Sequence, residues 1–165
     1  MNLRDGISFF GSDDIQQLEQ LLTSFLGETQ ASCAVLVDRS GRLLSSVGDT
    51  ANLDRITFAS LVAGDFAASD QLATLLGETE FSSLYHQGEG RSMFLADVGG
   101  WAILAALFDG RTTLGMVRVK SKALVPRFTR LFADLAARGP AKPLRELQAE
   151  WAAEAEDEID RLFTD

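Results

Sequence analysis

Ile56 to Leu76, with the sequence ITFASLVAGDFAASDQLATLL, is the stretch that decides the fold. Its apolar residues recur at the spacing of one long helix with two unlike faces. The small side chains gather on one side, at Ala59, Ser60, Ala63, Gly64 and Ala67. The large side chains gather on the other, at Phe58, Leu61, Leu72, Leu75 and Leu76. We expect the large side chains to cover a sheet.

The small side chains predict close packing against a second helix. The alternative is a solvated face made of good helix formers. Gly64 favours close packing, because glycine costs about 1 kcal/mol relative to alanine inside a helix. One short domain offers no spare helix for this role. We therefore expect the same helix from a second copy of the chain to pack there in a symmetric dimer.

The flanking sequence predicts the other elements. Before the central helix, we expect a helix from Ser12, as N-cap, to Gly27, and then a hairpin of strands 31–38 and 42–47. After it come strands 80–87, 91–98 and 101–108, the last two joined by Gly99 and Gly100. A final helix spans 114–137, and Pro126 should kink it or divide it in two. The fold class is α+β, with one five-stranded antiparallel sheet covered by helices on both faces in the order αββαβββα.

A Gly/Pro break divides the chain into a domain at 1–138 and a tail at 139–165. From Leu144 onward the tail has eight acidic and two basic side chains, which give it a net charge of −6. Its apolar residues recur at helical spacing, so the tail predicts an acidic amphipathic helix. Such a helix can dock on a partner or fold back on its own domain, and we favour the partner.

Composition limits the classes of function. The chain has 165 residues, 46% of them hydrophobic, and a net charge of −9. This charge makes nucleic acid and anionic membranes poor partners. The run Trp101–Phe108 is the longest wholly apolar one, too short to span a membrane, and no signal peptide is expected. The single cysteine, Cys33, lies in an apolar run and predicts a buried, inert thiol in a reducing compartment. We expect a cytoplasmic protein.

The sequence contains no constellation that predicts catalysis. A phosphate-binding P-loop is missing, and no histidine or cysteine cluster has metal-ligand spacing. The single histidine, His86, predicts a structural or interface role rather than a catalytic one. Asp65 falls on an apolar side of the central helix and needs a hydrogen-bond donor there. Residues 109–113 predict a turn that caps the last helix. We therefore expect no catalytic, cofactor-binding or metal-binding residue, and no enzyme activity of the chain itself.

Four stretches together resemble the roadblock/dynein light chain family. They are AVLVDRSGRLLSSVGD (34–49), LVAGDFAASDQLATLLGE (61–78), FSSLYHQGEGRSMFL (81–95) and ALFDGRTTLGMVRVK (106–120). They occur in family order, and the resemblance extends over about 12–137. The tail ending EDEIDRLF (156–163) is similar to that of family members that regulate a bacterial Ras-like polarity GTPase.

The resemblance implies a dimer formed by the central helix and by the edge strand 80–87, which would extend one sheet across both copies. The implied dimer interface is Ala59, Ser60, Ala63, Gly64, Ala67, Phe81, Ser83 and Tyr85. The resemblance also implies that the paired central helices bind a Ras-like small GTPase and that the tail reaches a second site on it. The implied partner-binding residues are Ala63, Ala67, Asp70, Gln71, Trp151, Ile159, Leu162 and Phe163.

Two functions therefore compete. The first is a GTPase-activating regulator in cell polarity or motility, concentrated at a cell pole, which orients the catalytic residues of the GTPase itself. The second is a roadblock adaptor that assembles a polarity complex without stimulating hydrolysis. A third, a small-molecule sensor, needs a pocket beneath the central helix, where the large side chains look like ordinary core. Whether the dimer joins two identical chains or pairs this chain with a paralogue stays open.

Overall fold

The computed structural model describes residues 10–139, 149, 152–153, 155–156 and 159–161. The predicted partner residues Trp151, Leu162 and Phe163 lie outside these residues. The element order is αββαβββα, as predicted. The elements are α1 (Ser12–Thr29), β1 (Cys33–Asp38), β2 (Leu43–Gly48), α2 (Arg55–Leu75), β3 (Ser83–Gln87), β4 (Ser92–Val98), β5 (Ala102–Phe108) and α3 (Leu114–Arg138).

The strands form one antiparallel sheet of five strands in the order β2-β1-β5-β4-β3. Strands β1 and β5 lie in its middle, where both faces are covered, and every residue of β1 is buried. This explains why these two strands are apolar on both alternating sides. Strand β3 lies at one edge, as its polar sequence predicts.

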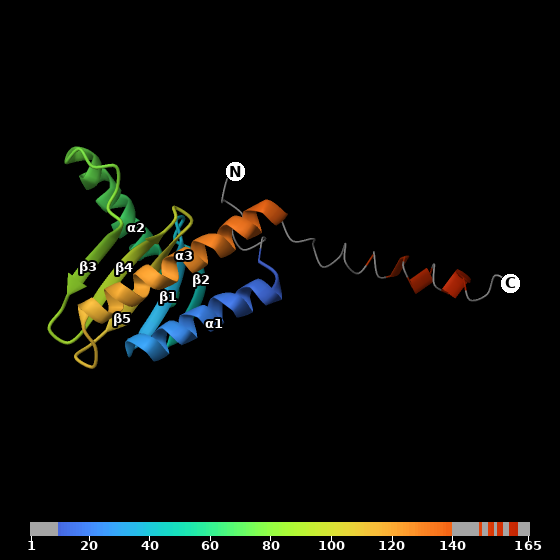
Figure 1. Ribbon diagram of the computed structural model, residues 1–165, viewed down its shortest axis with the longest axis horizontal. Coiled ribbons are helices and arrows are strands. Elements are labelled where there is room, and N and C mark those ends of the chain that lie inside the picture. Colours follow the sequence, from blue (N-terminus) through green and yellow to red (C-terminus); the bar gives the residue numbers. More distant parts are fainter. Residues whose placement is uncertain (1–9, 140–148, 150–151, 154, 157–158, 162–165) are drawn as a thin grey trace.

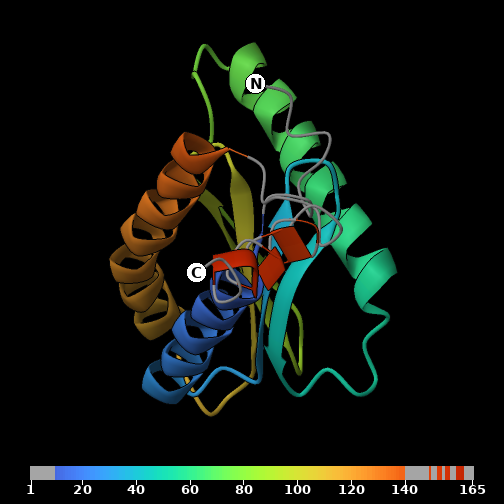
Figure 2. The same cartoon turned by 90° about the vertical axis from the view of Figure 1, so that its right-hand side faces the viewer.

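The sheet separates two hydrophobic clusters. Helices α1 and α3 pack side by side on one face, with Leu22 and Phe128 fully buried beneath them. Among the described elements, helix α2 alone lies on the other face, over Val35 and Ile103 (Figures 1 and 2). The prediction of helices on both faces of the sheet is confirmed.

The predicted orientation of α2 is wrong. The face that packs on the sheet consists of Ala59, Val62, Phe66, Ser69 and Ala73. Four of the large side chains assigned to the sheet, Leu61, Leu72, Leu75 and Leu76, are exposed instead. Ala59, assigned to the dimer interface, is fully buried in the core. Apolar side chains surround α2, so spacing alone did not identify the face on which Phe66, the largest side chain of the helix, is buried.

Helix ends differ slightly from the prediction. Helix α1 starts after Gly11, whose N–H donates to Asp14 Oδ2 over 2.9 Å. It continues past Gly27 and stops where Gln30 takes a left-handed conformation, with φ of 60°. Helix α3 is capped by the Thr113 hydroxyl, as residues 109–113 predict, and passes through Pro126 as a single helix.

Candidate functional site on the outer face of α2 and the edge strand β3

The side of α2 that faces away from the sheet is apolar and uncovered. Its large side chains are exposed to 70% at Ile56, 68% at Leu61, 55% at Leu72, 82% at Leu75 and 73% at Leu76. A helix that is apolar all round normally lies inside a larger protein body. Exposed apolar surface on this scale therefore indicates a protein–protein contact.

A strip of small or short side chains runs beside these leucines. Ser60, Gly64 and Ala67 are exposed and Ala63 is half-buried. A Cβ added to Gly64 would meet nothing within 4 Å in this chain. The fold of one chain does not therefore require glycine at position 64. A helix from another chain that packed closely there would require it, because a side chain would then be in the way. We call Ser60, Leu61, Gly64, Ala67, Gln71, Leu72 and Leu75 the α2 outer face.

Strand β3 presents an open edge. Within the described part of the chain it pairs with β4 alone. Ser83 is exposed and Phe81 is half-buried. Tyr85 stacks on Phe108 with ring centroids 6.3 Å apart, and Phe108 belongs to the cluster under α1 and α3. The Tyr85 ring therefore lies on the sheet face opposite α2, and what β3 offers a second strand is mainly its backbone.

His86 and Asp65 join β3 to α2. His86 Nε2 lies 2.6 Å from Asp65 Oδ2, so the histidine meets the need for a partner that the sequence showed for Asp65. Among the described residues the pair has no recorded hydrogen bond to a hydroxyl or thiol that could act as a nucleophile. The pair links two parts of the candidate surface, since His86 lies on β3 and Asp65 on α2.

Arg39 lies at the centre of a second link to α2. It bonds through Nη1 to Asp70 Oδ2 over 3.4 Å and through Nη2 to Asp97 at the end of β4. Its guanidinium carbon lies 5.1 Å from the centre of the Phe66 ring, within the range of a cation–π contact. Asp70, a predicted partner residue, is thus already engaged inside the chain, whereas its neighbour Gln71 is exposed.

The described residues also include one cysteine and several side chains of types that can bind metal ions. Cys33 is 1% exposed, and its burial raises the pKa of the thiol from 9.0 to about 11, which keeps it protonated and inert. No group of three or more histidine, cysteine, aspartate or glutamate side chains within the described residues could hold a metal ion. In that same part of the chain, no helix has the length and hydropathy of a membrane span.

Sequence reasoning placed Ser60, Gly64 and Ala67 on one exposed strip, but it also assigned the buried Ala59 to that strip and missed the large exposed residues. The buried side consists of Ala59, Val62, Phe66, Ser69 and Ala73, and it leaves Leu61, Leu72 and Leu75 outside. Among the predicted tail residues, Ile159 is described, and its side chain is 53% exposed.

Comparison with known proteins gives a consistent result. Residues 17–108 match the Roadblock/LC7 domain family. The chain is 36% identical to MglB of Myxococcus xanthus, with 72% of this chain and 96% of that one covered and a TM-score of 0.69. It is 33% identical to the gliding protein MglB of Thermus thermophilus, with 74% and 92% covered and a TM-score of 0.68. An MglB with a tetrameric arrangement is 31% identical, with 76% and 94% covered and a TM-score of 0.72. No curated protein matches the sequence.

Proposed function

The chain belongs to the Roadblock/LC7 family and is MglB-like, and from this membership we propose that it is a dimeric regulator of a Ras-like small GTPase of the MglA type. The observation that carries the proposal is the α2 outer face, whose leucines are exposed in the described part of the chain. The activity is GTPase activation in bacterial cell polarity or motility.

The α2 outer face supports a symmetric dimer. Ser60, Gly64 and Ala67 form a shallow strip beside the row of Leu61, Leu72 and Leu75. A twofold axis near Gly64 would lay the leucine row of one copy against the strip of the other, which buries both. Since β3 is an edge strand, it can pair with a second β3 and continue the sheet. A paralogue with the same surface could replace the second copy.

The paired helices would then form one continuous surface for the GTPase. Ala63, Ala67, Asp70 and Gln71 lie on or beside the outer face, as the family resemblance implies for partner binding. Asp70 would act mainly by holding α2 in place through Arg39. Activation would come from favouring the arrangement in which the GTPase's own residues are catalytic, because positioning accounts for much of phosphoryl-transfer catalysis.

The tail would add a second contact. We propose that 144–163 reaches the GTPase away from its nucleotide face, with Trp151, Ile159, Leu162 and Phe163 as apolar anchors. Its net charge of −5 would steer it towards a basic groove. Exposure of the Ile159 side chain, at 53%, is in keeping with an unoccupied anchor.

A second candidate is an adaptor that binds polarity proteins without activating a GTPase. The observation that favours it is the Arg39–Asp70 bond, which withdraws one of the predicted partner carboxylates into the fold. The adaptor would use the same dimer and the same α2 outer face.

One assay separates the two functions. The cognate MglA-type GTPase, loaded with GTP, is incubated with and without this protein, and phosphate release and binding are followed together. Stimulated turnover supports the regulator, and binding without stimulation supports the adaptor. The matched variants are Gln71→Arg on the α2 outer face and Gln16→Arg on α1, both at exposed glutamines. We expect only Gln71→Arg to weaken binding.

A further inference from the structure

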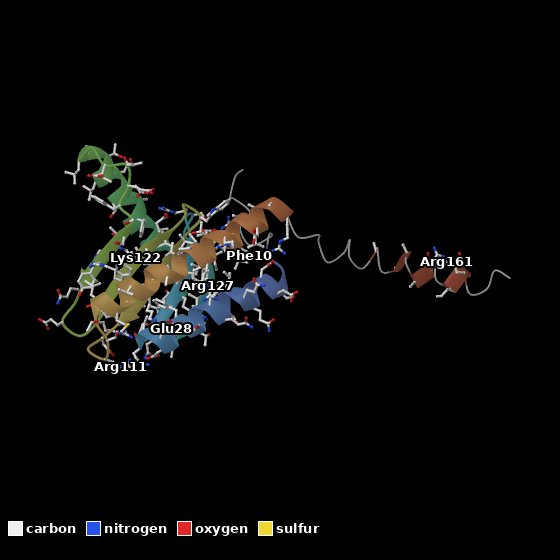
Figure 3. The ribbon with its side chains drawn as sticks, in the orientation of Figure 1. Phe10, Glu28, Arg111, Lys122, Arg127 and Arg161 are labelled. Atoms are coloured by element: carbon white, nitrogen blue, oxygen red, sulfur yellow. The ribbon has the colours of Figure 1, made fainter. Side chains whose placement is uncertain are left out.

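Helices α1 and α3 form a groove on the side of the sheet opposite α2. They run antiparallel, because Arg138 Nη2 lies 2.8 Å from Asp14 Oδ1 at one end and Lys120 Nζ lies 2.8 Å from Glu28 Oε2 at the other. Figure 3 shows Arg127 on α3 between these two ends. The groove encloses about 400 Å³ and is lined by Gln17, Gln20, Leu21, Ser24, Arg127, Arg130, Leu131 and Asp134.

The groove has an apolar floor, two arginines on its α3 side and uncharged polar side chains on its α1 side. Leu21 and Leu131 are half-buried, so each keeps apolar surface in contact with solvent. Arg127 and Arg130 are exposed, and neither forms an ion pair with another described residue. A second, smaller hollow lined by Leu21, Ser24 and Arg127 continues the groove to Lys120. An acidic amphipathic helix is the kind of ligand that matches such a surface.

The chain leaves the domain at one mouth of this groove. Helix α3 ends at Arg138, and Gly139, with φ of 74°, turns the backbone in a way that favours glycine. Residues 139–143 can span up to about 17 Å, enough to cross one helix diameter of about 10 Å. From Arg138 to Lys120 the groove is about 27 Å long, and a helix over 144–163 would be about 30 Å long.

We propose that the acidic segment 144–163 of this chain docks back into the groove between its own α1 and α3. In an antiparallel arrangement the charges match in order. The basic Lys142 and Arg145 come first, next to Asp134, and the acids from Glu146 onward follow, next to Arg130 and Arg127. Trp151 is then roughly level with the Leu21 and Leu131 floor, at 1.5 Å per residue.

Docking within one chain is favoured by the short connection. A linker of five residues gives an effective concentration on the order of millimolar, so modest contacts suffice. Figure 3 shows Arg161 beyond the end of α3, so the docked form is a second arrangement of the chain. In this arrangement the tail is withheld from any other protein. The inference concerns this chain alone and does not depend on the proposed GTPase.

Disulfide trapping in the full chain tests the docking. Ser24→Cys in the groove is combined with Ala155→Cys in the tail, and both positions are exposed. Buried Cys33 does not compete, because it is 1% exposed. We expect oxidation at low micromolar concentration to give an internal cross-link, seen as a monomer-sized band of increased mobility. The control pairs Ala155→Cys with Ala68→Cys on the outer side of α2, where no cross-link should form.

Charge variants test the recognition itself. Arg127→Glu with Arg130→Glu should slow the cross-linking by roughly tenfold, as the loss of two surface ion pairs predicts. Exchanging Glu150 and Glu154 for arginine in the same chain should restore the rate. Circular dichroism verifies that each variant is folded. A dimer-sized cross-link would show that the tail of a second copy fills the groove. Equal cross-linking in the control pair would show that the tail contacts the domain without preference for the groove. Either result overturns the proposal.

Discussion

Arg39 Nη1 lies 3.4 Å from Asp70 Oδ2, and this bond joins the turn between β1 and β2 to the C-terminal half of α2. Beyond Asp70, the one buried residue of the helix is Ala73, whereas Leu72 and Leu75 are exposed. The ion pair therefore adds to packing in holding this half of α2 on the sheet.

Replacing Arg39 by glutamine should destabilise the fold. The change leaves the partly buried carboxylates of Asp70 and Asp97 without their cation, and we expect a loss of about 1–2 kcal/mol in the free energy of unfolding. Urea unfolding followed by circular dichroism measures it. Arg55→Gln is the control, since among the described residues Arg55 makes only an exposed bond to Ser46, and it should cost less than about 0.5 kcal/mol. Equal losses of stability in the two variants would show that Arg39 contributes no more to the fold than an exposed arginine does.

Replacing Ala67 by tryptophan should separate the two copies of the chain. A large side chain on the small strip prevents close approach of two α2 helices, while leaving the buried face of α2 unchanged. Light scattering during size-exclusion chromatography should give a dimer for the original chain at micromolar concentration and a monomer for Ala67→Trp. Ala133→Trp, at an exposed alanine of α3, should stay dimeric. A monomeric original chain would exclude the proposed dimer.

No single arginine should be essential for GTPase activation. An inserted arginine contributes roughly 10³–10⁵ to hydrolysis in systems that use one. Replacing an exposed arginine near the outer face, such as Arg55, should instead weaken binding or orientation by a far smaller factor. Turnover at saturating regulator measures this. Complete loss of turnover with unchanged binding would identify an arginine finger.

Alkaline pH should destabilise the protein through Cys33. Burial raises the pKa of its thiol from 9.0 to about 11, so the folded state holds the proton more tightly than the unfolded state does. The contribution to stability is complete below pH 9.0 and is lost as the pH rises to about 11, up to about 2–3 kcal/mol in all. Urea unfolding at several pH values measures it. Cys33→Ala should show a shallower decline over this range; identical slopes in both proteins would contradict the assignment.

Deleting 144–165 should leave the domain folded and dimeric but weaken binding to the GTPase. The deleted segment has a net charge of −6, so the loss in affinity should shrink at high salt, where screening already reduces its contribution. Titration of the GTPase at two salt concentrations measures this. If affinity is unchanged, or if the shortened chain no longer folds, the tail is structural rather than a recognition arm.

Sequence patterns predicted the sheet well, because alternation and glycine turns constrain each strand locally. Gly99 and Gly100 both take positive φ values, of 60° and 76°, as a two-residue hairpin requires. The run at β5 is apolar throughout and lies in the middle of the sheet, where both of its faces are covered.

Sequence patterns predicted the candidate surface less well than the sheet. Apolar residues surround α2, so the side that packs on the sheet depends on contacts from distant strands rather than on local spacing. The engagement of Asp70 by Arg39 joins residues 31 positions apart, and the His86–Asp65 pair joins residues 21 positions apart. Such pairings form when distant segments come together in the fold, so neither residue type nor sequence spacing predicts them.

The apolar outer face of α2 links the folding of this protein to its own concentration. If two copies cover Leu61, Leu72 and Leu75 on each other, the dimer is favoured over unfolded chains by mass action. The unfolding temperature should then rise with protein concentration, as it does for dimeric proteins whose folded monomer is unstable. A cell that makes little of this chain would hold a larger unfolded fraction, so abundance itself would set how much working protein exists.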